Sequence, residues 1–157
     1  MKLGKYDEAI EQFKKTLEID ETYYESYIKI SECYKNINNF KIAIGYLDKA
    51  ISREPRSLEA HKIRAICYYS IGKYIESVND LRVCLDFKNI SSIEIADMLK
   101  YIAYCYKQLG KTNEALEIYE EALSHDGNNA NLKQEYEELQ KQVPIFSKLK
   151  GVFGKKK

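Results

Sequence analysis

The chain has 157 residues, of which 45% are hydrophobic and 31% charged, and it contains only 7 Gly and 2 Pro. So few helix-breaking and turn residues predict an all-α chain and exclude a β-sandwich, a collagen and low-complexity disorder. No stretch approaches the roughly 18 apolar residues of a transmembrane helix. The N-terminus is charged too early for a secretory signal, so a cytoplasmic location is expected.

The net charge of +1 hides an asymmetry between the body of the chain and its end. Residues 145–157 carry five lysines and no acid, whereas residues 1–144 carry 20 basic and 24 acidic side chains, a charge of −4. Affinity for duplex nucleic acid depends mainly on neutralising phosphates. An acidic body therefore argues against a nucleic-acid partner.

Hydrophobic periodicity and helix-ending residues predict eight helices along the chain. In chain order they are expected over residues 5–20, 23–36, 39–53, 56–70, 73–87, 92–109, 112–125 and 130–142. A turn built on Gly or Asn precedes every second helix, because such a residue adopts the left-handed conformation that ends the helix before it. These turns are Leu3-Gly4-Lys5-Tyr6, Ile37-Asn38-Asn39-Phe40, Ile71-Gly72-Lys73-Tyr74 and Leu109-Gly110-Lys111-Thr112.

The turns recur at steps of 34, 34 and 38 residues, and a pattern of small and large residues recurs with them. Small residues stand five positions after each turn residue, at Ala9, Ala43, Ser77 and Ala115. Large residues follow four positions later, at Phe13, Leu47, Leu81 and Tyr119. Positions four apart share a helix face, so the small residue admits a partner helix and the large one fills the space beside it. The 38-residue step places four extra residues near Ser91–Ile95, which we expect to lengthen the following helix.

With these spacings, residues 1–129 resemble the tetratricopeptide repeat (TPR) family. The resemblance implies a right-handed α-solenoid of helix-turn-helix repeats with a C-terminal capping helix. We expect a solenoid over residues 1–143 and a basic amphipathic or disordered tail over 144–157. The solenoid divides into a half repeat at 1–23, full repeats at 24–57, 58–91 and 92–129, and a capping helix at 130–143.

An arginine and the cysteines stand out at equivalent positions of the repeats. Arg64 stands where the other repeats have Ile30 and Ile102, so its charge must reach solvent or find a partner. Three of the four cysteines, at 33, 67 and 105, occupy one equivalent position, and stacked hairpins would separate them beyond the reach of a disulfide or a shared zinc ion. We therefore expect reduced, buried packing residues.

No constellation for catalysis is found in the sequence. His61 and His125 are 64 residues apart, and neither a Gly-rich phosphate loop, a serine elbow nor an HExxH motif occurs. We predict a protein that is not an enzyme, with no catalytic residue, no cofactor and no metal. Its expected function is that of a scaffold or adaptor.

In the TPR family, the first helices of successive repeats line a concave groove that holds a peptide segment of a partner protein. Carried over by position, the predicted groove residues are Ile28, Lys62, Ile63, Ile66, Tyr69, Lys100, Tyr101, Tyr104 and Lys107. Some relatives clamp a chaperone's C-terminal carboxylate with Lys and Asn side chains. Here the clamp positions hold Ile28 and Glu32, then Lys62, then Tyr101, so chaperone binding is not predicted.

The two ends of the chain leave alternatives open. The first helix lacks a preceding partner, which suggests either self-association through Ile10, Phe13 and Leu17 or a chain that continues a longer protein. The tail has apolar and basic residues at helical spacing, among them Phe146, Lys148, Leu149, Lys150 and Phe153. It is a solubilising tail, a contact to a membrane or partner, or a segment that folds back into the groove. A peripheral membrane adaptor is thus the main alternative function.

Overall fold

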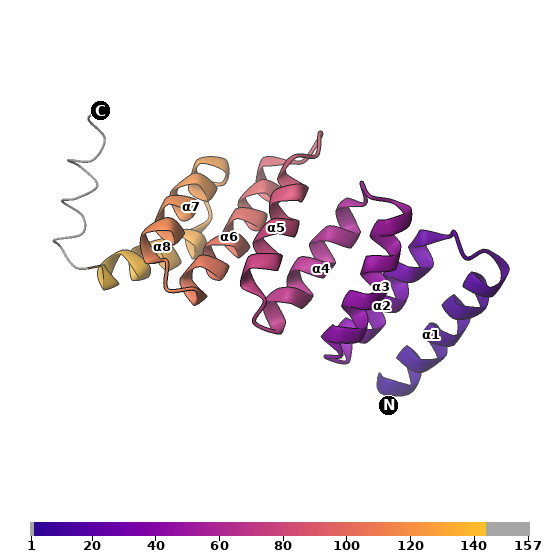
Figure 1. The fold of residues 1–157 in the computed structure, drawn as a ribbon. Helices are drawn as coiled ribbons and strands as arrows, with labels where there is room; N and C mark the ends of the chain where they lie inside the picture. The colour runs from indigo at the N-terminus through magenta and orange to yellow at the C-terminus, as the bar shows by residue number, and fades with distance from the viewer. Residues whose placement is uncertain (1, 144–157) are drawn as a thin grey trace. The chain divides into compact units, whose positions relative to one another are not determined.

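The structure is a computed structural model that describes the backbone of residues 2–143 and the side chains of residues 4–143. The described residues form eight α-helices joined by short connections (Figure 1). They are α1 (Lys2–Ile19), α2 (Tyr24–Asn36), α3 (Phe40–Arg53), α4 (Leu58–Ser70), α5 (Tyr74–Leu85), α6 (Ser92–Gln108), α7 (Thr112–His125) and α8 (Ala130–Gln142). The all-α fold is confirmed.

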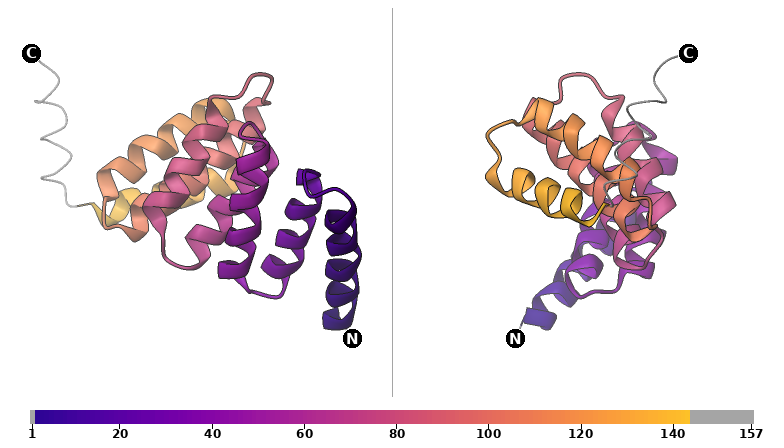
Figure 2. Two further views of the ribbon diagram at one scale, coloured as in Figure 1. Left: turned by 45° about the vertical axis from the view of Figure 1, so that its right-hand side comes forward. Right: turned by 90° about the vertical axis from the view of Figure 1, so that its left-hand side faces the viewer.

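Contacts between Cα atoms divide the chain into two compact units, residues 1–88 and residues 89–157. In the first unit, α2 packs with α3 and α4 packs with α5, while α1 lies on α2 and α3 contacts α4. In the second unit, α6 pairs with α7, and α8 packs on α7. Figure 2 shows these neighbouring helices side by side from two further directions. Helix pairs stacked on their neighbours are the packing that a helical repeat protein requires.

The predicted turn residues adopt the conformation that their chemistry favours. Asn38, Gly72 and Gly110 have φ values of 60°, 77° and 71°, in the left-handed region. Each lets the chain reverse between the two helices of a hairpin. The first predicted turn, Leu3-Gly4-Lys5-Tyr6, is wrong, because Gly4 lies inside α1.

The small residues of the repeat pattern lie where helices approach each other most closely. Ala43, Ser77 and Ala115 are at most 1% exposed, and the Ser77 hydroxyl donates a hydrogen bond of 2.8 Å to the Ala65 carbonyl on the facing helix. The large residues that follow them, Leu47, Leu81 and Tyr119, are also buried. The period of the sequence therefore corresponds to the contact between the two helices of each hairpin.

The four extra residues lengthen α6, as predicted. It has 17 residues, whereas α2 and α4 have 13 each. Its start is fixed by a capping box, in which the Ser91 hydroxyl accepts from the Glu94 backbone N–H and the Glu94 carboxylate accepts from the Ser91 N–H. This reciprocal pair satisfies two amide groups that a helix start leaves without partners.

The cysteines are buried thiols, as predicted. Burial raises the pKa of the Cys67 thiol to about 11 and that of the Cys84 thiol to about 12. Since the thiolate is the reactive form, these two side chains act as small apolar residues at neutral pH.

Candidate functional site

A pocket of about 380 Å³ opens between α2 and α4, the first helices of two successive repeats. Leu58, Ile63 and Ile66 form its apolar part, and the side chains of Glu32, Glu59 and Lys62 complete its lining. Its size lies within the range of pockets that hold small ligands or single side chains of a partner. Because α2 and α4 belong to the same compact unit, this pocket is fully defined by residues 1–88.

The repeat itself explains why apolar residues reach the surface here. Ile63 is 6% exposed and belongs to a core cluster with Tyr27, Ala60 and Cys67, so it joins the pocket to the hydrophobic core. Ile66 lies three positions further along the same helix and remains partly exposed. An apolar surface that is anchored on a rigid helix and open to solvent suits an apolar side chain of a partner.

Lys29 joins the two helices at the edge of the pocket. Its ammonium group donates to the Glu32 carboxylate at 2.9 Å and to the Glu59 carboxylate of α4 at 3.3 Å. The Glu32 bond is the largest cause of the raised pKa of Lys29, so the group stays charged. Lys62 also lines the pocket, so the two carboxylates here are balanced by two ammonium groups.

Further carboxylates lie at the N-terminal end of α2. Burial is the largest cause of the raised pKa of the Tyr24 hydroxyl, and the charges of Glu25, Glu54 and Glu59 raise it further. Glu59 both lines the pocket and belongs to this group. Glu59 thus links the acidic side chains about Tyr24 to the pocket.

The predicted groove residues do not all lie at one surface in the structure. Lys62, Ile63 and Ile66 line the pocket together with Glu32, Leu58 and Glu59, and of these six only Leu58 does not follow from family position. Tyr69 packs edge-on against Tyr74 at a ring distance of 5.6 Å.

Ile28 corrects the prediction. It is 1% exposed and lies in the core cluster beneath α2, so it cannot contact a ligand. The family position predicts an exposed side chain at Ile28, but α2 buries this side against α3 and α4.

The other predicted groove residues lie on α6, in the second unit. Tyr101 and Tyr104 pack edge-on with ring centroids 5.7 Å apart. The Tyr104 hydroxyl donates to the Glu135 carboxylate of α8 at 2.8 Å, so its polar end is held by the last helix. Lys100 pairs with Asp97 at 3.1 Å, and Lys107 is exposed.

Behind the pocket, the charged Arg64 side chain pairs with aspartates on two other helices. Its guanidinium donates to both carboxylate oxygens of Asp80 on α5, at 2.8 and 2.7 Å, and to Asp48 on α3 at 2.7 Å. The bonds to Asp80 are the main cause of the raised pKa of Arg64. His61 lies 3.0 Å from Asp80 and 3.1 Å from the Pro55 carbonyl. This network ties α3, α4 and α5 together and orients the helix that carries the pocket.

The expected self-association face of α1 is largely covered. Ile10 is 4% exposed and packs with Ile30 and Cys33, so its place on an exposed face is wrong. Phe13 and Leu17 are partly buried against the same cluster. Helix α2 covers this side of α1 because the two helices pack along their length.

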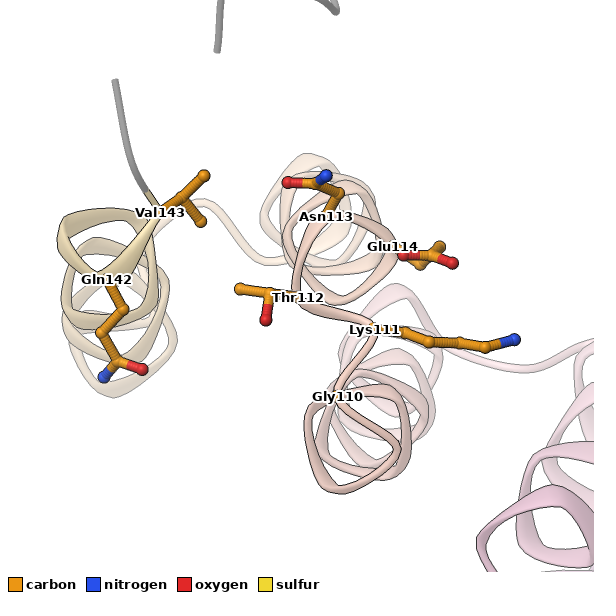
Figure 3. A pocket seen from close by; sticks show the side chains of 7 residues that line it. All are labelled: Gly110, Lys111, Thr112, Asn113, Glu114, Gln142 and Val143. Carbon is orange, nitrogen blue, oxygen red and sulfur yellow. The ribbon is translucent and has the colours of Figure 1, made fainter. Parts of the chain in front are cut away.

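A second pocket, of about 400 Å³, lies between the start of α7 and the end of α8. Figure 3 shows Thr112 and Val143 facing each other across it, whereas the Lys111 and Glu114 side chains point away. Few side chains are thus directed into this space, and none of the predicted site residues lies there.

The predicted tail residues Phe146, Lys148, Leu149, Lys150 and Phe153 lie outside the described part of the chain. The contact of this tail with a membrane or a partner stays a prediction. Within residues 2–143, no helix is long and apolar enough to cross a membrane.

Known proteins with similar sequences contain the same repeat. A family described as "Psidin, N-terminal TPR repeats region" matches residues 32–137, and a tetratricopeptide repeat matches residues 1–23. Hsp70-Hsp90 organizing protein 1 of Glycine max is 31% identical over 135 residues, which cover 83% of this chain and 23% of that protein. The heat shock protein sti1 homolog of Schizosaccharomyces pombe is 31% identical over 94 residues, 60% of this chain and 15% of that one. The chain thus spans less than a quarter of the length of these relatives.

Solved structures support the fold. MamA has a TM-score of 0.79 at 23% identity, with 88% of this chain and 78% of that chain covered. The first TPR of Spaghetti, solved with an HSP90 peptide, has a TM-score of 0.66 at 18% identity, with 78% and 94% covered. Together with the paired helices and the family match over residues 32–137, these findings show that the chain belongs to the tetratricopeptide repeat family.

Proposed function

We propose that this chain is an adaptor that binds a peptide segment of a partner protein, with the pocket between α2 and α4 taking an apolar side chain of that peptide. The observation that carries the proposal is the open apolar surface of Leu58, Ile63 and Ile66 on the first helices of two repeats. Apolar anchors in well-packed pockets supply most of the affinity in such complexes, and charged side chains at the rim tune rate and specificity.

The charges around the pocket favour a peptide other than a C-terminal carboxylate. Some structural relatives are named for chaperones, and one was solved with an HSP90 peptide. In this chain, the corresponding part of α2 presents the Glu32 carboxylate and a buried Ile28. A carboxylate beside Glu32 would be repelled, so an internal peptide segment with an apolar anchor fits better.

The second unit offers a separate contact region on α6. Tyr101 presents an aromatic ring beside Tyr104, and Lys107 is exposed on the next turn. Aromatic residues are enriched where proteins contact partners. We assign a supporting role to Tyr101 and Lys107, and none to the Tyr104 hydroxyl, which is already bonded to Glu135.

The test is a peptide selected from a displayed random library on the intact chain, with its affinity measured by fluorescence anisotropy. Ile66→Asp is expected to weaken binding about tenfold or more, because it places a charge in an apolar contact. Ile75→Asp is the matched control, since Ile75 is 61% exposed on α5 and does not line the pocket. Equal affinity of the two variants would contradict the proposed site.

A further inference from the structure

The α2–α4 pocket combines two properties that together specify a type of ligand. Its interior is apolar, through Leu58, Ile63 and Ile66. At its edge, Glu32 and Glu59 stand against the ammonium groups of Lys29 and Lys62. At the start of α2, the charges of Glu25 and Glu54 act on Tyr24 together with that of Glu59. Lys29 is already shared by two of these carboxylates, at 2.9 and 3.3 Å. An apolar peptide that also carries lysines would therefore complement this surface better than an acidic one.

The chain contains a segment with this composition. Residues 145–157 read IFSKLKGVFGKKK, with five apolar side chains, five lysines and no acid. The rest of the chain carries a net charge of −4. Residues 145–157 thus combine a charge opposite to that of the rest of the chain with apolar side chains of the kind that the pocket accepts.

We propose that the α2–α4 pocket binds residues 145–157 of a second copy of the chain, so that the protein associates with itself. The pocket belongs to residues 1–88, whereas residues 145–157 are assigned to the other unit. Binding between copies therefore requires no particular arrangement of the two units within one chain. The inference rests on the proposed function, because the same pocket and the same apolar anchors are used.

Such an interface is head to tail, since the surface given by one copy differs from the surface it receives. A heterologous contact of this kind lets each bound copy offer its own free segment to a third. We expect a mass that increases with protein concentration and decreases with added salt, because exposed charge pairs are screened within about 10 Å at 0.1 M salt.

A charge exchange tests the proposal directly, with analytical ultracentrifugation of the full chain as the measurement. Glu25→Lys/Glu59→Lys reverses two of the charges that act on Tyr24, one of them in the pocket lining, and Lys148→Glu/Lys150→Glu makes the segment acidic. Each variant alone is expected to lose self-association by about tenfold or more, because like charges then meet. A mixture of the two is expected to regain it, because the unchanged segment of the first variant meets the unchanged pocket of the second, and the acidic segment of the second meets the altered pocket of the first.

Controls separate a lost contact from a damaged fold. Glu117→Lys/Glu121→Lys makes the same charge change at two exposed positions of α7, and is expected to leave self-association unchanged. Circular dichroism checks that every variant retains its helices. Ile66→Ser tests the apolar half of the contact at a partly exposed position, and is expected to weaken association without a change of charge.

Three outcomes would overturn the inference: a wild-type chain that stays monomeric at its highest soluble concentration, association that the α7 control weakens equally, or a mixture that fails to restore association. If the chain is monomeric while the library peptide still binds in an Ile66-dependent manner, self-association fails and the proposed function stands. If Ile66→Asp leaves peptide binding unchanged, the proposed function itself fails.

Discussion

Asp80→Ala is expected to be among the most damaging single substitutions in the first unit. The Asp80 side chain is 6% exposed and accepts two bonds from Arg64, whose side chain is 19% exposed, and one contact from His61. Removing the carboxylate leaves a largely buried guanidinium without its main partner. Breaking a buried ion pair in this way costs about 3–5 kcal/mol.

Asp48→Ala is the matched control, since it removes a carboxylate from the same arginine. Its bond to Arg64 is as short, at 2.7 Å, but the Asp48 side chain is 53% exposed. Exposed ion pairs contribute only about 0.2–1 kcal/mol. The structure therefore predicts a several-fold difference between two substitutions that delete the same chemical group.

Urea unfolding followed by circular dichroism measures both free energies, and thermal unfolding should show a decrease of roughly 10 °C for Asp80→Ala. The double variant Arg64→Met/Asp80→Leu is expected to recover most of the loss, because apolar residues of similar volume can replace a buried pair at little cost. Equal small losses for Asp80→Ala and Asp48→Ala would refute the network as the element that holds α3, α4 and α5 together.

The remaining predictions concern turns, thiols and the last helix. Gly45→Ala in α3 meets no atom within 4 Å and should stabilise the chain by about 0.5–1 kcal/mol, whereas Gly72→Ala, at φ +77°, should destabilise it by about 1 kcal/mol in thermal unfolding. Burial raises the pKa of Cys84 to about 12 from 9.0, so unfolded chains lose this proton first. The neutral Cys84 thiol therefore contributes its full stability below pH 9, and this contribution is lost as the pH rises toward 12. In Cys84→Ala, the free energy of unfolding measured by urea titration should decrease less over this pH range. Glu135→Ala removes the acceptor of two tyrosine hydroxyls and should speed hydrogen exchange in α7 and α8 but not in α2 or α4; equal acceleration in all four would contradict the separate role of this contact.

The repeat pattern predicted most of the fold because it has a local physical cause. A small residue at Ala43 and a large one at Leu47 can only be explained by close helix packing on one face, and the left-handed turn at Gly72 follows from glycine chemistry. The helix bounds agree within three residues. Gly4 was misassigned because its sequence matches the other turns, whereas the turn exists only when a helix precedes it.

The sequence analysis predicts that Arg64 reaches solvent or finds a partner, but it does not identify Asp80, although the sequence contains a signal for it. Arg64 replaces Ile30 of the previous repeat, and at the same spacing Asp80 replaces Tyr46. Two apolar positions that become opposite charges in the same repeat indicate that their side chains meet. Aligning the second helices of the repeats at this position would have identified the partner.

The candidate site was less predictable than the fold. Family position predicts Lys62, Ile63 and Ile66 as groove residues, and all three line the α2–α4 pocket, but it could not determine which side of each helix is buried. Helix α2 buries Ile28, whereas Glu32 on the next turn is partly exposed and lines the pocket. The acidic group about Tyr24 includes Glu54 at the end of α3, whose charge acts on Tyr24 only once the helices are packed.

The most direct test of the central claim is a nuclear magnetic resonance titration of the full ¹⁵N-labelled chain with the library-selected peptide. The account predicts that amide shifts concentrate at Glu32 and along residues 58–66, and that Ile66→Asp abolishes them while Ile75→Asp does not. Shifts that concentrate around the α7–α8 pocket, or on the outer faces of α3 and α5, would contradict the claim that the α2–α4 pocket is the peptide-binding site.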